Sequence, residues 1–232
     1  MKNSSELFDE YAKSYDVALE AALEVSGEGR EYFANGRVGW LAGCLARLQE
    51  HPRTALDFGC GDGKTSPLLR QILHVEHVLG VDVSAKSIDS ARSQCQDEAI
   101  EYATADSFRP DGRIDVAYCN GVFHHIPPPD RLANFRRIHA ALRPGGLFGF
   151  WENNPWNPAT HYVMSQCAFD QDAQMLSPVE ARGTLKQAGF EILRTDYLFV
   201  FPRSLKVFRG IERAISALPL GTQYQVLCRK PR

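Results

Sequence analysis

Three histidines, His124, His125 and His161, are the side chains best suited to proton transfer near neutral pH. An imidazole titrates close to neutrality, so it can take a proton from a reacting hydroxyl or amino group. His124 and His125 are adjacent in the stretch HHIP, and His161 lies among aromatic residues. We expect at least one imidazole of HHIP to face a ligand and favour His125 as the base. The alternative is that both histidines cap or pack the following helix.

A second group of residues is suited to binding rather than to proton transfer. The stretch LDFGCGDGKTS, residues 56–66, places Gly59, Gly61 and Gly63 at every second position, after an apolar run and before an expected helix. Glycine permits backbone conformations that a Cβ forbids and lets backbone N–H groups approach a ligand closely. We interpret Cys60, inside this turn, as a small apolar filler.

These residues must be positioned by an α/β fold. Short apolar runs, typical of strands, alternate with patterns of helical period from residue 53 onward, which predicts a doubly wound, mostly parallel sheet. Two helices are expected before it, at 4–24 and 29–49. The expected strands are 54–59, 77–84, 100–107, 114–123, 146–153, 190–201 and 222–230, and the expected helices between and after them are 64–74, 85–96, 130–142, 178–188 and 203–218.

In a doubly wound sheet the ligand lies beyond the carboxyl ends of the strands, where the first strand-to-helix turn receives it. Asp82 ends the run VLGVD, 19 residues after Gly63, close to the spacing of an acid that accepts hydrogen bonds from ribose hydroxyls. A dinucleotide fits this pattern less well, because Lys64 stands where its fingerprint needs Gly or Ala. Asp57 would repel a pyrophosphate and attract an ammonium group. An amino acid joined to a nucleoside therefore fits better than NAD.

Five motifs in order resemble the class I S-adenosylmethionine-dependent methyltransferases. They are LDFGCGDG, GVDVS, ATADSF, DVAYCNGVFHHIP and LRPGG, and together they cover residues 54–152. The N-terminal stretch FDEYAKSYD also resembles the helix that closes over the cofactor in relatives acting on small molecules, including those of quinone and biotin biosynthesis. The resemblance implies a Rossmann-like, seven-stranded sheet with an antiparallel last strand, N-terminal helices and S-adenosyl-L-methionine as cofactor.

The resemblance also implies roles for individual residues. Asp57 and the turn 59–63 would hold the methionine part, Asp82 with the adjacent Val83 the ribose, and Asp106 the adenine amino group, with Ser107 and Phe108 beside it. Asn120 would line the sulfonium, and Tyr11 and Tyr15 of the N-terminal helix would complete the cofactor site. The alternative for both Asp82 and Asp106 is an ordinary turn residue at the end of a strand.

The stretch FWENNPWNPATHY follows the fifth strand of the core and begins a long connection, 153–176. Polar groups between large aromatics suit an orienting pocket for a small, partly flat acceptor, and His161 lies here. A proline-braced surface loop that covers the core is the alternative. We expect no metal site, because adjacent histidines point in different directions and no carboxylate cluster accompanies them.

Composition excludes several classes of protein. The net charge of −2 over 232 residues provides no field for gathering nucleic acid phosphates, so we expect no nucleic acid partner. Six scattered cysteines without a C-x-x-C pair favour a reducing compartment, and the absence of an apolar leader or a long apolar run favours a cytoplasmic protein without stable membrane insertion. We expect one domain, a monomer or homodimer, with a helical cap at 1–50, a cofactor core at 53–152 and acceptor-binding elements at 153–220.

The C-terminal residues 202–232 carry seven basic residues and one acid, a local charge of +6 against −8 for the remainder. At 100° per residue the cations of the expected helix 203–218 gather on one side and its apolar residues on the other. We expect the apolar side to pack on the domain and the cations to face water. The alternative is that the cations attract a phosphate, a carboxylate or an anionic membrane surface.

The sequence thus predicts a methyltransferase that moves the methyl group of S-adenosylmethionine to an oxygen or nitrogen of a small metabolite. Alignment of donor and acceptor can supply roughly 7–11 kcal/mol of the barrier, so a base is optional. Three alternatives stay open: an NAD(P)-dependent oxidoreductase, a non-catalytic S-adenosylmethionine-binding protein, and a methyltransferase acting on RNA or protein.

Overall fold

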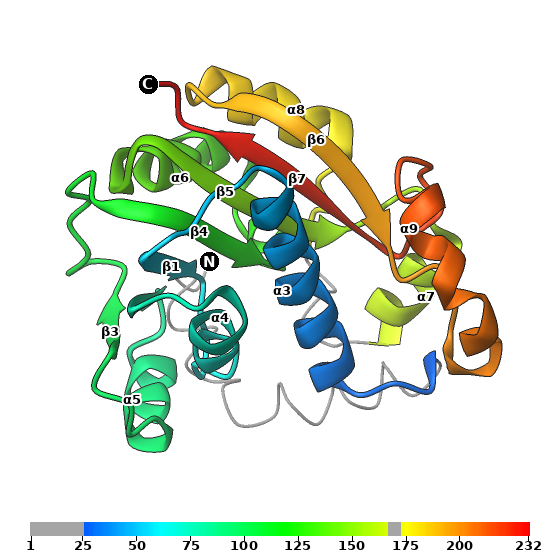
Figure 1. Cartoon of the computed structure of the whole chain (residues 1–232), viewed down its shortest axis with the longest axis horizontal. Helices are drawn as coiled ribbons and strands as arrows, with labels where there is room; N and C mark the ends of the chain where they lie inside the picture. Colours follow the sequence, from blue (N-terminus) through cyan, green and yellow to red (C-terminus); the bar gives the residue numbers. More distant parts are fainter. Residues whose placement is uncertain (1–25, 167–172) are drawn as a thin grey trace.

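The computed structural model describes residues 26–166 and 173–232, so the expected helix at 4–24, with Tyr11 and Tyr15, lies outside the described residues. The elements, labelled as in Figure 1, are α3 (Arg30–Arg47), β1 (Thr54–Phe58), α4 (Ser66–Leu73), β2 (His77–Asp82), α5 (Ala85–Gln94), β3 (Ile100–Thr104), β4 (Ile114–Asn120), η2 (Phe123–His125), α6 (Pro128–Ala141), β5 (Leu142–Asn153), α7 (Pro158–Gln166), α8 (Pro178–Gln187), β6 (Glu191–Leu198), η4 (Arg203–Ile211), α9 (Glu212–Ile215) and β7 (Gln223–Arg229).

The strands form one seven-stranded sheet in the order β3-β2-β1-β4-β5-β7-β6. The pairs from β3 to β5 are parallel, and β7 runs antiparallel to both β5 and β6. This confirms the predicted doubly wound, mostly parallel sheet with an antiparallel last strand. The strand order reverses between β1 and β4, so the carboxyl ends of these two strands flank the crevice in which such sheets bind ligands.

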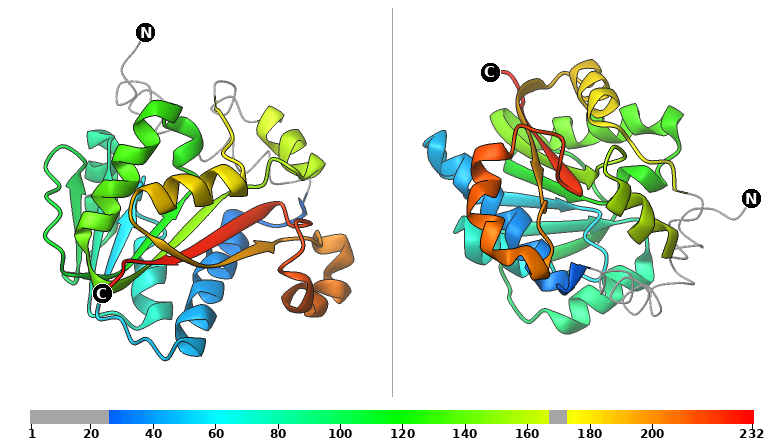
Figure 2. Two further views of the ribbon diagram at one scale, coloured as in Figure 1. Left: turned by 90° about the horizontal axis from the view of Figure 1, so that it is seen from above. Right: turned by 90° about the vertical axis from the view of Figure 1, so that its right-hand side faces the viewer.

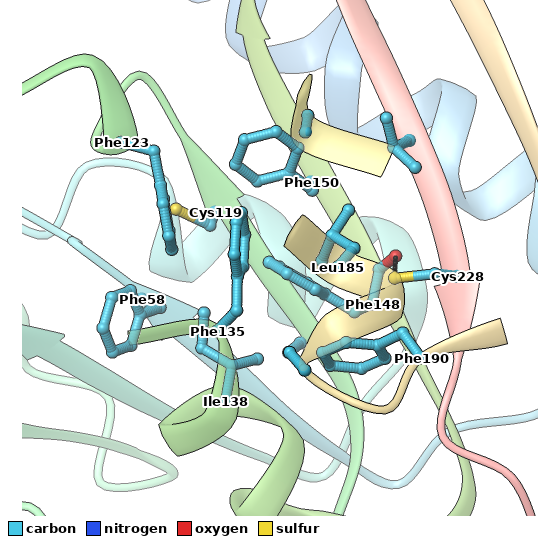
Figure 3. Packing of buried hydrophobic residues seen from close by; sticks show 14 of the residues in the cluster. Phe58, Cys119, Phe123, Phe135, Ile138, Phe148, Phe150, Leu185, Phe190 and Cys228 are labelled. Atoms are coloured by element: carbon cyan, nitrogen blue, oxygen red, sulfur yellow. Dashed lines mark hydrogen bonds between the residues drawn. The ribbon is translucent and has the colours of Figure 1, made fainter. Parts of the chain in front are cut away.

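Apolar side chains fill both faces of the sheet. One cluster lies under α6 and α8, where the Phe123 and Phe135 rings stack with centroids 4.0 Å apart and Phe150 meets each of them edge-on (Figure 3). The other cluster lies under α3, α4 and α5 and includes Leu41 and Trp151, both fully buried. Helices therefore cover both faces, as Figure 2 shows from two directions.

Local sequence explains where several helices begin. The Ser84 hydroxyl accepts a hydrogen bond from the Ser87 N–H at 3.1 Å and caps α5, and Ser177 caps α8 through the Glu180 N–H at 3.2 Å. Proline occupies the first turn of α4, α6 and α8. A backbone N–H in the first turn has no acceptor within the helix, so proline, which lacks this group, loses no helical hydrogen bond there. Residues at the start of each of these helices therefore determine where the helix begins.

One prediction on elements needs correction. The expected helix 203–218 is a 3₁₀ segment, η4, followed by the single turn α9, and its apolar side does not pack on the domain, because no residue of η4 or α9 is buried. The connection 153–176, expected to be more than a plain connection, contains α7. The helix predicted at 29–49 is confirmed as α3.

Candidate functional site

The glycine turn lies between β1 and α4, and all three of its glycines have positive φ: 77° at Gly59, 54° at Gly61 and 80° at Gly63. A Cβ on Gly59 would come within 2.2 Å of the Val122 side chain, and one on Gly63 within 2.6 Å of the Tyr102 hydroxyl. A Cβ on Gly61 would meet nothing within 4 Å. Two glycines are therefore needed for packing, whereas Gly61 borders open space and leaves a cradle for a ligand.

Asp82 lies beside this cradle at the carboxyl end of β2. Its Oδ2 accepts a hydrogen bond from the Gly61 N–H at 2.8 Å, and its Oδ1 accepts one from the Ser84 N–H at 2.9 Å. A carboxylate has about four lone-pair positions, more than the backbone N–H groups of Gly61, Ser84 and Val83 occupy, so it can still accept from a ribose hydroxyl. Burial raises the pKa of Asp82, although the backbone N–H bonds act in the opposite direction. The residues of the turn thus fit a nucleoside.

Asp57, at the end of β1, is only 2% exposed, and its Oδ2 accepts a hydrogen bond from the Ser66 hydroxyl at 2.8 Å. Burial raises the pKa of Asp57 to about 7, although the Ser66 bond lowers it, and the charge of Asp82 raises it further. A cation bound nearby stabilises the ionised form of such a buried acid and so lowers its pKa. Asp57 therefore fits a site for an ammonium group.

The end of β3 adjoins the ribose position. The Ala105 N–H donates to the Asp82 carbonyl oxygen at 2.7 Å, which ties the two strand ends together. Asp106 and Ser107 are exposed, and the Ser107 hydroxyl bonds the Thr104 carbonyl at 2.9 Å. Phe108 is buried instead, and Val83 is 48% exposed beside Asp82. The exposed Asp106 carboxylate can therefore accept a hydrogen bond from a ligand.

A histidine and a glutamate form a buried pair next to the crevice. His124 Nδ1 lies 2.7 Å from Glu152 Oε2, and the other carboxylate oxygen, Oε1, accepts the Phe123 N–H at 2.7 Å. Burial would raise the pKa of Glu152, but His124, the Phe123 N–H and His125 together hold the pKa below its ordinary value of 4.5. The imidazole of His125 lies against that of His124, with ring centroids 4.0 Å apart. Glu152 thus orients the histidine pair.

This pair sits close to the end of β4. Gly121 follows Asn120, which is half-buried, and a Cβ on Gly121 would lie 3.7 Å from His124 Cε1. The buried Arg131 donates to the Phe123 and Ile126 carbonyls at 3.1 and 3.0 Å and so supports η2 from below. These hydrogen bonds therefore anchor the HHIP stretch at the expected sulfonium end of the crevice.

His161 does not join the histidine pair. It is exposed on α7, and its Nε2 bonds the Pro155 carbonyl oxygen at 2.7 Å. Trp156 is 50% exposed and stacks on Tyr197 with ring centroids 6.3 Å apart. The aromatic stretch thus divides into buried members, such as Trp151, and an exposed group on and before α7.

The part of the chain that the structure describes contains no group of three or more His, Cys, Asp or Glu residues arranged to hold a metal ion. Within the same residues, no helix is long and apolar enough to cross a membrane. From the sequence, Glu152 is expected only to line a polar and aromatic pocket, whereas in the structure its carboxylate contacts His124. The parallel pairing of β4 with β5, whose carboxyl ends must meet, is the signal that could have located it.

The buried Glu152 leads to a test of stability against pH. Because its pKa in the folded chain is lowered, its contribution is present above the ordinary pKa of about 4.5 and is lost as the pH falls through the lowered value. We expect Glu152→Gln to destabilise the protein by about 1–3 kcal/mol near pH 7, with the difference shrinking toward about pH 3.5. Urea unfolding at both pH values measures this, and an unchanged difference would contradict it.

Gly61 allows binding to be separated from packing. Gly61→Ala places a methyl group in the cradle and forces a residue with a Cβ to keep φ near 54°, which costs about 1–2 kcal/mol of stability. We expect the affinity for an adenosine-containing ligand to fall by at least about tenfold. Calorimetric titration and thermal unfolding give the two values. Gly39→Ala, on the exposed face of α3, is the control that should leave affinity unchanged.

Comparison with known proteins agrees with this geometry. A family model described as a methyltransferase domain matches residues 55–146, which span the glycine turn, Asp82 and the HHIP stretch. The trans-aconitate 2-methyltransferase of Rhodopseudomonas palustris is 29% identical over 140 residues, covering 60% of this chain and 54% of that protein. The enzyme of the same name from Escherichia coli O139:H28 is 29% identical over 167 residues, covering 68% and 66%. The chain thus spans about half to two-thirds of the length of these relatives.

Among solved structures, the magnesium protoporphyrin IX methyltransferase of Synechocystis with bound S-adenosylhomocysteine superposes with a TM-score of 0.66 at 16% identity, covering 98% of this chain and 100% of that one. This similarity concerns the fold. The chain thus matches the methyltransferase domain family over residues 55–146 and shares the fold of a solved S-adenosylmethionine-dependent methyltransferase.

Proposed function

We propose that this chain binds S-adenosylmethionine at the glycine turn and transfers its methyl group to a small-molecule acceptor. The observation that carries the proposal is the Gly61 cradle with Asp82 hydrogen-bonded beside it and a buried acid, Asp57, behind it. When bound, the cofactor supplies an activated methyl group on a sulfonium. The chain's own residues hold its ribose through Asp82 and its adenine edge through Asp106.

We further propose that His125 accepts a proton from the acceptor, while Glu152 and His124 position it. His125 is half-buried, more open than His124, and lies at the carboxyl end of β4 beside the expected sulfonium. The exposed residues on and before α7, including Trp156, Tyr162 and His161, would contact the acceptor. In this scheme residues 53–152 form the cofactor core, and residues 153–220 choose the acceptor.

The names of the relatives support a carboxylate-bearing acceptor as the first class to test. The experiment is to supply methyl-labelled S-adenosylmethionine together with trans-aconitate, and in parallel with a metabolite extract, and to identify the labelled product. Transfer to a metabolite supports the proposal and excludes a protein that only binds the cofactor. Label found solely on RNA or protein would instead favour a macromolecular acceptor.

Asp57 makes cofactor binding depend on pH. The ligand's ammonium group favours the ionised carboxylate, and a pKa of about 7 means that the acid must lose a proton on binding at lower pH. We expect the affinity for S-adenosylhomocysteine to fall about tenfold between about pH 8 and about pH 6. Calorimetry at both pH values measures this. Asp57→Asn should bind more weakly at pH 8 and lose the dependence, and a variant that keeps it would refute the assignment.

A further inference from the structure

The segment 203–220, which contains η4 and α9 and is here called the η4–α9 segment, exposes an unusual amount of apolar surface. Val207 is 80% exposed. Five more large apolar residues of the segment are between 44% and 51% exposed: Leu205, Phe208, Ile211, Leu218 and Leu220. Isolated exposed apolar residues are common on proteins, but a contiguous group of this size marks an interaction surface.

The 3₁₀ geometry of η4 explains how this surface forms. Side chains three residues apart eclipse one another in a 3₁₀ helix, so Phe208 and Ile211, which follow the kink at the non-helical residue Leu205, share one face. The neighbouring face carries Arg209 and Glu212. The helix therefore has an apolar face and a polar face. The contacts of the polar residues determine which of the two faces is exposed to solvent.

The polar face is attached to the body of the protein. Arg209 Nη1 bonds Glu28 Oε1 at 2.9 Å, and its guanidinium lies 4.5 Å from the centroid of the Tyr32 ring. Glu212 Oε1 accepts the N–H groups of Val200 and Phe201 at 3.2 and 2.9 Å. These contacts hold the polar residues against the body, while Phe208 packs on Phe201 with ring centroids 5.7 Å apart and stays 49% exposed. Figures 1 and 2 show the segment (orange) standing at the outer edge of the molecule.

The charges at its margin indicate what the surface binds. The segment contains four cations and a single acid, Glu212, whose Oε1 accepts two backbone N–H groups. Lys206 and Arg213 are exposed, and among the described residues neither forms an ion pair with an acid; the Arg213 guanidinium lies over Gly43 of α3. Apolar side chains flanked by exposed cations are the combination that binds the headgroup region of anionic bilayers.

We propose that the η4–α9 segment docks on an anionic lipid surface, with Phe208 and Ile211 entering the headgroup region and Lys206 and Arg213 contacting lipid phosphates. β6 runs parallel to β5, since both pair antiparallel with β7, so the segment leaves the sheet at the edge that holds the candidate site. The Asn157 side-chain amide also donates to the Leu220 carbonyl and links the segment to α7. Docking thus brings the acceptor side of the proposed enzyme next to the membrane, a consequence that rests on the proposed function.

Sedimentation of the full chain with vesicles tests the docking without any need for activity. We expect binding to phosphatidylcholine vesicles containing about 30% phosphatidylglycerol and at least fivefold weaker binding to pure phosphatidylcholine. Phe208→Ser combined with Ile211→Ser, and separately Lys206→Gln combined with Arg213→Gln, should each weaken binding to the anionic vesicles at least fivefold. Val179→Ser is the control, because Val179 is 69% exposed on α8, outside the segment.

Thermal unfolding and S-adenosylhomocysteine titration of each variant show whether the fold is retained, and the charge variant supplies a second test should the apolar one fail to fold. The proposal is overturned when the anionic vesicles do not sediment the protein, or when both variants bind as the parent does. A concentration-dependent dimer that the Phe208 and Ile211 substitutions abolish would assign the surface to a second copy instead. Vesicle binding without methyl transfer would contradict the proposed function alone.

Discussion

Asp82→Ala is expected to weaken binding of S-adenosylhomocysteine by at least about 100-fold. The substitution removes the carboxylate proposed to receive both ribose hydroxyls, and hydrogen bonds to a charged group contribute about 1.5–3 kcal/mol each. It also removes the acceptor of the Gly61 N–H, at 2.8 Å, and so loosens the cradle itself. Calorimetric titration of parent and variant measures the loss.

Asp62→Ala is the matched control for this result. Asp62 lies in the same turn, but its carboxylate pairs with Lys64 at 2.7 Å, and the side chain is 26% exposed. A surface pair of this kind contributes little to stability, so the variant should bind within a few-fold of the parent. Equal affinity in the parent and the Asp82 variant would refute the ribose assignment.

His125→Ala is expected to slow methyl transfer by about 10²- to 10⁴-fold, the usual contribution of a positioned base, while cofactor affinity stays within about twofold. The reason is that His125 lies at the carboxyl end of β4, whereas the proposed ribose and ammonium contacts come from β1 and β2. Initial rates with the acceptor found by labelling, together with S-adenosylhomocysteine titration, separate the two effects.

His161→Ala serves as the comparison, because its ring is exposed and bonded to the Pro155 carbonyl. We expect its effect on the rate to be below about tenfold. A full rate in the His125 variant would show that alignment alone drives the transfer and that the HHIP stretch only supports the helix after it.

Much of the cofactor side could be predicted from the sequence, because its signals are local. Three glycines at alternate positions require positive φ and close approach, and the structure has both at Gly59 and Gly63. The role of Asp82 could be predicted because this residue ends an apolar run 19 residues after Gly63, close to the spacing of a ribose-binding acid. The doubly wound, mostly parallel sheet follows from the alternation of strands and helices, and the structure confirms it.

The η4–α9 segment could not be predicted, because long-range contacts decide its orientation. A period of 100° per residue suggests an α-helix with its apolar side inward. Arg209 instead reaches Glu28, 181 residues away in the sequence, and holds the polar side against the body. Nothing near position 209 in the sequence indicates that pairing.

The role of Glu152 was missed for a related reason. In the sequence it stands among aromatic residues after the fifth strand of the core, and it reaches His124 only because β4 and β5 pair in register, with Asn120 opposite Trp151. Register between two strands depends on the packing of the whole sheet rather than on local pattern. The distant partner of a buried histidine is therefore harder to predict than the histidine itself.

The most direct test is calorimetric titration of the purified chain with S-adenosylhomocysteine and, in parallel, with NAD. We expect S-adenosylhomocysteine to saturate one site per chain and NAD at the same concentrations to produce no binding heat. Saturation by NAD, with no heat from the adenosylated amino acid, would contradict the assignment of the glycine turn.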